Sequence, residues 1–359
     1  MGAHLTDRSS TSSKNIRRLL QAVLSLAVVV AIFFFALPQV ADFSSVWDAI
    51  GKMTWAELAT LAIVAAWNLV TYWFVMVASM PGLNYWQAMK VNLTSTAISN
   101  TMPGGGALGI GVTTAMFHGY GFSKTQISLS ILVTGIWNNF VKLGMPILAL
   151  ALLALQGDAS TALITAALIG LLVLAGAIVL FALVLKSERL AWRVGEGLGK
   201  PLNLVRKLFR KPPVDHFGDS VVRFRKDTID LLSRTWLSLT IATLVSHFSL
   251  YLVLLLALRH VGVSDAEVSW QQVLASFSFI RLVSALPVTP GGLGVVELGL
   301  TAALVAAGGD EAGVVAAVLL YRALTYLVPI PLGALSYVFW RKGAKRRALA
   351  RAAAKEAAG

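Results

Sequence analysis

The sequence predicts an all-α, polytopic integral membrane protein. Of its 359 residues, 57% are hydrophobic and 13% are charged, and the mean hydropathy is +0.75. Apolar runs long enough to cross a hydrocarbon core of about 30 Å recur along the chain. Basic residues gather in alternate loops, as they do in multi-pass membrane proteins. A soluble core is neither needed nor expected.

Six full spans can be drawn, at residues 19–37, 57–79, 126–155, 160–185, 236–258 and 314–340. The first span follows Lys14, Arg17 and Arg18 and therefore resembles a signal peptide. Its apolar core, however, exceeds the roughly 7 to 15 residues of such a peptide. We expect a retained anchor that follows a cytoplasmic N-terminus of residues 1–18.

The basic residues predict the orientation of the chain. Residues 1–18, the loops that hold Lys90 and Lys124, the basic loop 186–234 and the tail 341–359 carry 25 of the 30 Lys and Arg residues. The opposite loops carry only Lys52 and Arg259. Positive loops stay inside, so we expect both termini in the cytoplasm. Topology and anionic lipid headgroups account for the net charge of +13 without nucleic acid.

Two further apolar segments, 87–117 and 271–307, are broken near their middles by Pro103-Gly104-Gly105 and Pro290-Gly291-Gly292. The loops on both sides of the first segment are predicted to be cytoplasmic, and those on both sides of the second to be external. Each segment must therefore enter and leave on the same side. We expect two oppositely oriented re-entrant helical hairpins.

The hairpins belong to a predicted inverted repeat of span, span, hairpin and span. The first copy covers residues 19–155 and the second 160–340. Trp86-Gln87 and Trp270-Gln271 open the hairpins, and each last span carries a cation followed by a proline: Lys142 with Pro146, and Arg322 with Pro329. Inverted repeats with broken helices at their centre are typical of transporters.

The Pro-Gly-Gly breaks have two interpretations. Proline ends a helix, and glycine permits positive φ and close backbone approach, which a tight reversal requires. The half-helix after the break would present N–H groups suited to an anion. A packing turn without a ligand is the alternative.

Charged residues should meet beside the second break. At about 1.5 Å per residue, Arg281, Glu297 and Arg322 reach similar depths near the middle of the membrane. One Glu with two Arg leaves excess positive charge, to which Lys142 would add, so an anionic group, best a phosphate, should bind here. A purely structural ion pair of Glu297 with Arg281 or Arg322 is the alternative. Asn100 and Tyr326 are expected to be hydrogen-bond partners rather than ligands.

The second half carries a specific motif. Residues 287–297, PVTPGGLGVVE, follow Arg281-Leu282 and precede Tyr321-Arg322-Ala323-Leu324-Thr325-Tyr326. This pattern resembles the flippase-like transmembrane domain of lysylphosphatidylglycerol synthases of the multiple peptide resistance factor type. The resemblance covers roughly residues 15–342. It implies a protein that moves a lipid between leaflets, with Arg281, Pro290, Gly291, Gly292, Glu297 and Arg322 at the characteristic positions.

Two departures from that family are visible. The first hairpin reads NTMPGGGALGIGV and lacks the Glu and Arg that often follow Pro-Gly in relatives, so its role is expected to differ. The chain ends at Gly359 after a basic tail, without the synthases' aminoacyl-transferase domain. We therefore expect a stand-alone member that is not an enzyme and does not make aminoacylated lipid.

Other function classes fit less well. The chain has no cysteine, its five His are scattered, and no phosphate-binding G-x-x-x-x-G-K-[ST] loop occurs, so no metal or cofactor is expected. A membrane transferase would need a catalytic acidic or metal cluster. An ion-coupled transporter of a small anionic solute stays open. The transported lipid could be an anionic phospholipid, an aminoacylated one or a polyprenyl-phosphate-linked lipid. Two kinds of protein partner also stay open: another copy of the chain and a lipid-modifying enzyme.

Overall fold

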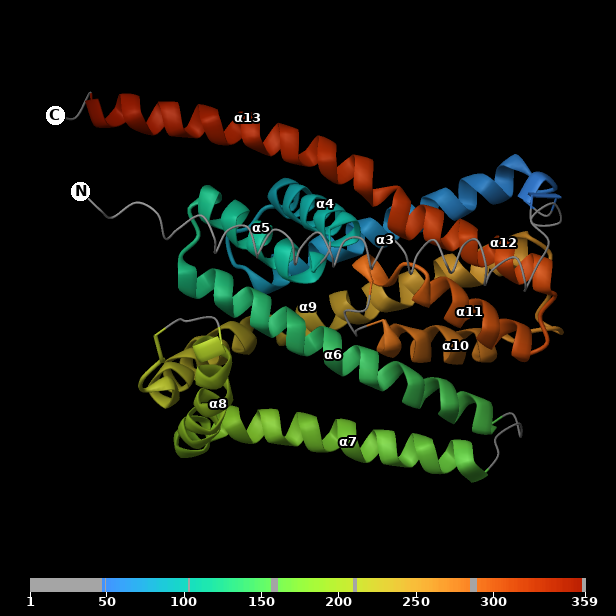
Figure 1. Ribbon diagram of the computed structural model, residues 1–359, viewed down its shortest axis with the longest axis horizontal. Coiled ribbons are helices and arrows are strands. Elements are labelled where there is room, and N and C mark those ends of the chain that lie inside the picture. Colours follow the sequence, from blue (N-terminus) through green and yellow to red (C-terminus); the bar gives the residue numbers. More distant parts are fainter. Residues whose placement is uncertain are drawn as a thin grey trace, which may run out of the picture. The chain divides into compact units, whose positions relative to one another are not determined.

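The computed structural model describes residues 47–356 apart from 49, 103, 156–160, 209–211 and 285–288, and it is helical throughout that part (Figure 1). The elements are α3 (Trp55–Ser79), α4 (Tyr85–Thr101), α5 (Gly105–Tyr120), α6 (Lys124–Leu155), α7 (Thr161–Lys186), α8 (Glu188–Leu208), α9 (Phe217–His260), α10 (Trp270–Val283), η3 (Pro290–Gly292), α11 (Val295–Ala306), α12 (Glu311–Arg322), η4 (Ala323–Leu327) and α13 (Pro329–Glu356).

Five segments of the described chain are long and apolar enough to cross a membrane: Trp55–Ser79, Lys124–Leu155, Ile164–Lys186, Phe217–His260 and Glu311–Gly343. They coincide with five of the six predicted spans, which confirms a polytopic membrane protein. The predicted first span, 19–37, lies outside the described residues. The number of crossings and the inverted repeat therefore stay predictions.

The chain divides into two compact units. The first contains Met1–Trp73, Asn84–Phe122 and Ser246–Gly359, and the second contains Phe74–Leu83 and Ser123–Val245. Both predicted hairpins belong to the first unit. The predicted halves of the repeat do not coincide with these units, because α3 and α9 each contribute residues to both.

In the first unit, α4 and α5 pack against each other as a helical hairpin, and α10 and α11 form a second pair. Equivalent capping boxes begin the two pairs. Asn84 Oδ1 accepts from Gln87 N at 2.9 Å, and Ser269 Oγ accepts from Gln272 N at 3.3 Å, while each Gln side chain binds the cap residue's N–H in return. Trp86-Gln87 and Trp270-Gln271, which the sequence suggested as equivalent, therefore do not occupy equivalent positions. Trp86 is the second residue of its helix, whereas Trp270 is the first residue of its own.

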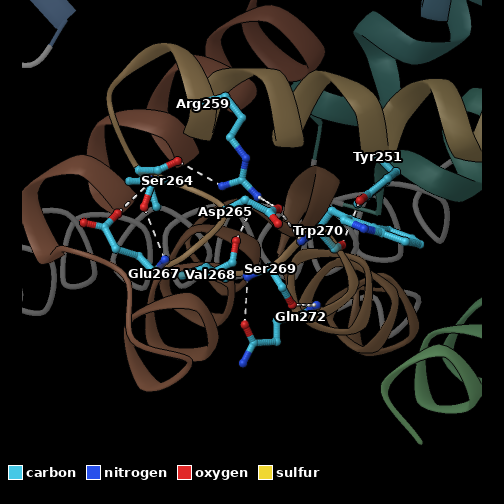
Figure 2. Close-up of polar contacts among 10 residues, drawn as sticks. Tyr251, Arg259, Ser264, Asp265, Glu267, Val268, Ser269, Trp270 and Gln272 are labelled. Carbon is cyan, nitrogen blue, oxygen red and sulfur yellow. Dashed lines mark hydrogen bonds and ion pairs between the residues drawn. The ribbon is translucent and has the colours of Figure 1, made fainter. Parts of the chain in front are cut away.

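An arginine holds the loop that leads into α10 (Figure 2). Arg259 donates to the carbonyl oxygens of Val263 at 2.9 Å and Val268 at 2.8 Å, and to Asp265 Oδ1 at 2.6 Å. The same Asp265 oxygen accepts from the N–H of Trp270, the first residue of α10, at 2.9 Å. One guanidinium thus fixes both the loop and the start of the second helix pair.

The last span contains a wide turn. Residues Ala323–Leu327 form a π-helix, in which the N–H of Val328 binds the carbonyl of Ala323 at 2.9 Å. Pro329 follows directly and has no N–H, so it cannot continue the α-helical bonding of the preceding turn. Such single π-turns frequently mark functional sites. Further along this span, α13 packs closely on α4, where a Cβ at Gly333 would collide with the carbonyl of Leu93.

In the second unit, α7 packs on α6 and on α8. Its buried core contains Val75, Leu129, Val133, Leu231, Leu232 and Leu239. The basic loop 186–234, whose interleaved basic and apolar residues predict amphipathic helices, is largely helical: α8 occupies most of its first half. The span predicted from 236 begins earlier, because α9 starts at Phe217. Residues 217–234 are polar but follow a helical period, with Leu231 and Leu232 buried. Hydropathy alone therefore missed this extension.

Candidate functional site

The second break brings several predicted residues together in the first unit. Gly291 and Gly292 lie in η3, Glu297 lies in the first turn of α11, and Arg322 is the last residue of α12. Pro290 begins η3. The η3 segment contacts both α4 and α5, so the broken part of one helix pair packs against the other pair.

A buried ion pair forms the centre of the site. Arg322 Nε donates to Glu297 Oε1 at 2.7 Å, and the two side chains are 12% and 1% exposed. Of the two arginines predicted as possible ion-pair partners of Glu297, Arg322 is the one in contact with it. Arg322 Nη2 also donates to the carbonyl oxygen of Gly291 at 3.2 Å, so the same guanidinium binds the break itself.

The carboxylate of Glu297 also caps its own helix. Its Oε2 accepts from the N–H of Gly294 at 2.6 Å, and the negative charge lies at the N-terminus of α11, where the helix dipole stabilises it. The Pro-Gly-Gly pattern predicted N–H groups after the break that could bind an anion. At least one of them is occupied by the protein's own acid, so the guanidinium groups are the better candidates for contact with a ligand.

The break requires glycine at position 291. Gly291 has φ +57°, and a Cβ there would lie 2.5 Å from Tyr326 Cε2 and 3.0 Å from Asn100 Oδ1. Gly292 has φ +69° and Gly294 has φ +84°. Left-handed backbone and close approach of a ring therefore coincide at one residue, as the Pro-Gly-Gly motif predicted.

Tyr326 joins the ion pair to the first helix pair. The guanidinium carbon of Arg322 lies 4.4 Å from the centre of the Tyr326 ring, in cation–π contact. The Tyr326 hydroxyl donates to the carbonyl of Asn100, and Asn100 Nδ2 donates to the carbonyl of Tyr326 at 3.1 Å. Both residues therefore make hydrogen bonds between helices, as predicted, and the structure shows that they make them with each other. The wide π-turn, which the sequence analysis did not anticipate, is the segment that carries Tyr326.

Arg281, in the last turn of α10, makes no ion pair with Glu297 among the described residues. Its Nε atom is buried, and no hydrogen-bond partner for this atom is present in the described part of the chain. The end of α10 approaches the break, because a Cβ at Gly292 would lie 3.6 Å from the Cβ of Ser284, three residues after Arg281. Arg281 and the Glu297–Arg322 pair belong to the first unit.

The first break is also tightly built. Gly104 has φ +67° in open space, whereas a Cβ at Gly105 would collide with the backbone carbonyl of Ser99. Ser99 Oγ in turn donates to the carbonyl of Gly105 at 3.2 Å. Pro103 lies outside the described residues. The positive φ of Gly104 and the close contact of Gly105 explain the first two of the three successive glycines here, whereas Gly106 has nothing within 4 Å of a Cβ.

Lys142 belongs to the second unit, in α6, four residues before Pro146. Its predicted membership of the charge cluster stays a prediction. Within the residues that the structure describes, no three His, Asp or Glu side chains gather as metal ligands would.

The fold and the site define a polytopic helical membrane protein with two broken helix pairs and a buried ion pair beside one break. Residues 22–333 match the family model described as the lysylphosphatidylglycerol synthase TM region, and the chain belongs to this family. The resemblance inferred from the second-half motif is thereby confirmed. A comparison with curated protein sequences finds no match.

Proposed function

We propose that this protein moves a lipid with an anionic phosphate headgroup between the leaflets of a prokaryotic cytoplasmic membrane. The observation that carries the proposal is the composition of the buried site. Arg281 and Arg322 bring two positive charges, and Glu297 offsets one of them. An uncompensated buried cation is costly, so the site favours a visiting anion.

The proposed contacts follow from the donors. Arg281 has a buried Nε without a partner among the described residues, and the guanidinium of Arg322 binds Glu297 and Gly291 through Nε and Nη2. A guanidinium has five N–H donors in a planar fork that fits a phosphate. The headgroup would bind to both guanidinium groups while Glu297 keeps Arg322 in place.

In this proposal the two helix pairs are re-entrant hairpins that enter from opposite sides, within an inverted repeat and with both termini in the cytoplasm. The contact of η3 with α4 and α5 supports a shared centre for the hairpins. Their similar capping boxes and glycine breaks support a common ancestral unit. A break of this kind is tolerated in a membrane only where protein or a cavity surrounds it.

Three lipids share the required phosphate: phosphatidylglycerol, an aminoacylated derivative such as the lysylphosphatidylglycerol of the family's description, and a polyprenyl phosphate. The deciding experiment reconstitutes the purified chain in vesicles with each labelled lipid and measures its exposure in the outer leaflet. We expect accelerated exchange of at least one of them, and a loss of that activity in Arg281→Gln.

An ion-coupled transporter of a small anionic solute is the second candidate, because such transporters are also built from inverted repeats with broken helices. Uptake of radiolabelled phosphate and carboxylate solutes into the same vesicles separates the two. Solute uptake without lipid exchange would overturn the lipid proposal.

A further inference from the structure

The helix α8 leaves the span candidate α7 at a fixed corner in the second unit. Only Ser187 separates the two helices, and its Oγ accepts from the N–H of Leu190 at 3.2 Å. Arg225 of α9 binds the end of α7, donating to the carbonyl oxygens of Leu185 at 2.8 Å and Lys186 at 3.2 Å. Figure 1 shows α8 turning away from α7 instead of continuing it. Because α7 is long and apolar enough to span a membrane, we expect α8 to begin where the chain leaves the hydrocarbon.

One face of α8 is covered by the start of α9. Gly195 packs so closely that its Cβ would lie 2.8 Å from the Cα of Gly218, and the Cβ of Gly199 would lie 3.3 Å from that of Phe217. The carboxylate of Glu196 accepts from the N–H of Gly218 at 3.0 Å. These contacts fix the rotation of α8 about its own axis.

The opposite face of α8 is apolar, and within the described structure it is half-buried at Leu190 and Val194 and exposed at Leu198 and Leu204. At about 100° per residue, Leu190, Val194, Leu198 and Leu204 fall on one side of the helix. Leu198 is 54% exposed and Leu204 is 71% exposed. Exposed leucines on the apolar face of a helix favour contact with an apolar neighbour, which water does not provide.

A row of exposed cations borders this apolar face. It consists of Arg189, Arg193, Lys200 and Lys207, none of which takes part in an ion pair with another described residue. An apolar face beside a basic edge is the pattern of a helix that lies in a membrane interface. A second copy of this face would bring like charges together, whereas anionic lipid headgroups complement them.

We propose that α8 is a docking surface for anionic phospholipids, with Leu198 and Leu204 in the acyl-chain boundary and Arg189, Arg193 and Lys200 bound to headgroup phosphates. The surface is separate from the Glu297–Arg322 site, so the proposal does not depend on lipid transport. Its function is to fix the corner between α7 and α9 to a leaflet that contains anionic lipid.

The test uses the absence of cysteine from the chain. A single cysteine replaces Leu204 in the full chain and carries an environment-sensitive dye, in vesicles of phosphatidylcholine with a minority of phosphatidylglycerol. Nitroxide quenchers are placed on the acyl chains of either lipid in separate samples. The control position is Asp219, which is exposed on the neighbouring helix α9. We expect quenching at position 204 by both lipids, several-fold stronger from phosphatidylglycerol, and little quenching at position 219.

The charge requirement is tested with the triple variant Arg189→Gln, Arg193→Gln and Lys200→Gln. Each basic residue near an anionic surface contributes about fivefold in affinity. The preference for phosphatidylglycerol should therefore fall to about unity, while quenching by phosphatidylcholine persists and shows that α8 remains in place. The matched variant Arg223→Gln, Lys226→Gln and Arg234→Gln on α9 should retain the preference. Equal preferences in both triple variants, an unquenched dye at position 204, or energy transfer between dyes on separate copies would each overturn the proposal.

Discussion

The guanidinium of Arg322 lies 2.7 Å from the carboxylate of Glu297, although the two residues are 25 positions apart and belong to different helices. Both side chains are almost fully buried. Attraction across such a short distance in a poorly solvated site is strong, but so is the desolvation penalty of each ion. The pair therefore fixes α11 against α12, although its net contribution to the free energy of unfolding is small.

The first prediction concerns this pair. Glu297→Gln leaves an amide oxygen to accept from Gly294 but removes the charge that balances Arg322. Loss of one partner of a buried pair costs about 3 kcal/mol or more. We expect a clear loss of thermal stability in detergent and of transport. Adding Arg322→Gln should restore much of the stability but no transport. As a control, Asp219→Asn at an exposed site should be nearly neutral, and additive losses in the double variant would contradict the pairing.

A second prediction separates the glycines of the two breaks. Gly291→Ala adds a methyl group 2.5 Å from the Tyr326 ring at positive φ, whereas Gly104→Ala meets only the strain of positive φ in open space. That strain is worth about 1 to 2 kcal/mol. We expect Gly291→Ala to abolish lipid exchange and Gly104→Ala to reduce it. The control Gly176→Ala in α7 meets nothing within 4 Å and should be neutral or slightly stabilising. Equal activity in all three variants would show that the breaks are packing turns only.

The third prediction concerns Tyr326. Tyr326→Phe removes the hydroxyl that donates to Asn100 but keeps the ring beside Arg322, and should cost about 1 kcal/mol with partial activity. Tyr326→Leu removes the ring as well. We expect a larger loss of stability and little lipid exchange from Leu, measured by thermal unfolding and vesicle assays. If Phe and Leu behave alike, contact with the cation is not what matters.

The fourth prediction concerns the loop between α9 and α10, which Arg259 holds in place. Arg259→Lys keeps the charge but cannot reach two carbonyl oxygens and Asp265 through one planar group. Hydrogen exchange in the first turn of α10 should rise by tenfold or more. The first turn of α4, which starts with the independent capping box at Asn84, should be unchanged. Equal exchange in both turns would mean that the caps alone hold these helix ends.

The fifth prediction tests topology. Single cysteines at the exposed positions Lys124, Ala266 and Glu311 are treated in intact cells with an impermeant thiol reagent. We expect labelling at Ala266 and Glu311 but not at Lys124, because the basic loops are predicted to be cytoplasmic. Labelling of Lys124 from outside would exclude a first hairpin that enters from the cytoplasm.

Much of the site could be predicted because its chemistry depends on residue types that apolar sequence rarely contains. A Glu and two Arg in spans are conspicuous, and depth arithmetic placed Glu297, Arg281 and Arg322 at similar depths. The same arithmetic could not select between Arg281 and Arg322, since it fixes depth but not the rotation of each helix. The partner depends on side-chain packing around Tyr326 and Gly291, which only the fold provides.

Other parts could not be predicted for identifiable reasons. Pro329 has no N–H, so one carbonyl in the preceding turn lacks its helical hydrogen-bond donor. Whether the chain then forms a π-turn depends on the packing of Tyr326 against Asn100, which belongs to a helix far away in the sequence. The early start of α9 was missed because a hydropathy window measures composition, while residues 217–234 carry a helical period in polar sequence. Conversely, the sequence contains the capping boxes as an N-x-x-Q pattern at Asn84 and an S-x-x-Q pattern at Ser269. These patterns identify the equivalent first residues of α4 and α10 better than the Trp-Gln pairs do.

The wide turn at residues 323–327 holds one residue more than an α-helical turn does. Each residue of an α-helix turns the chain by about 100° and advances it by about 1.5 Å. The extra residue therefore offsets the helical phase of α13 from that of α12 by about this amount. The face of α12 that carries Arg322 consequently does not continue along α13, so the two parts of the last span present different faces to their neighbours.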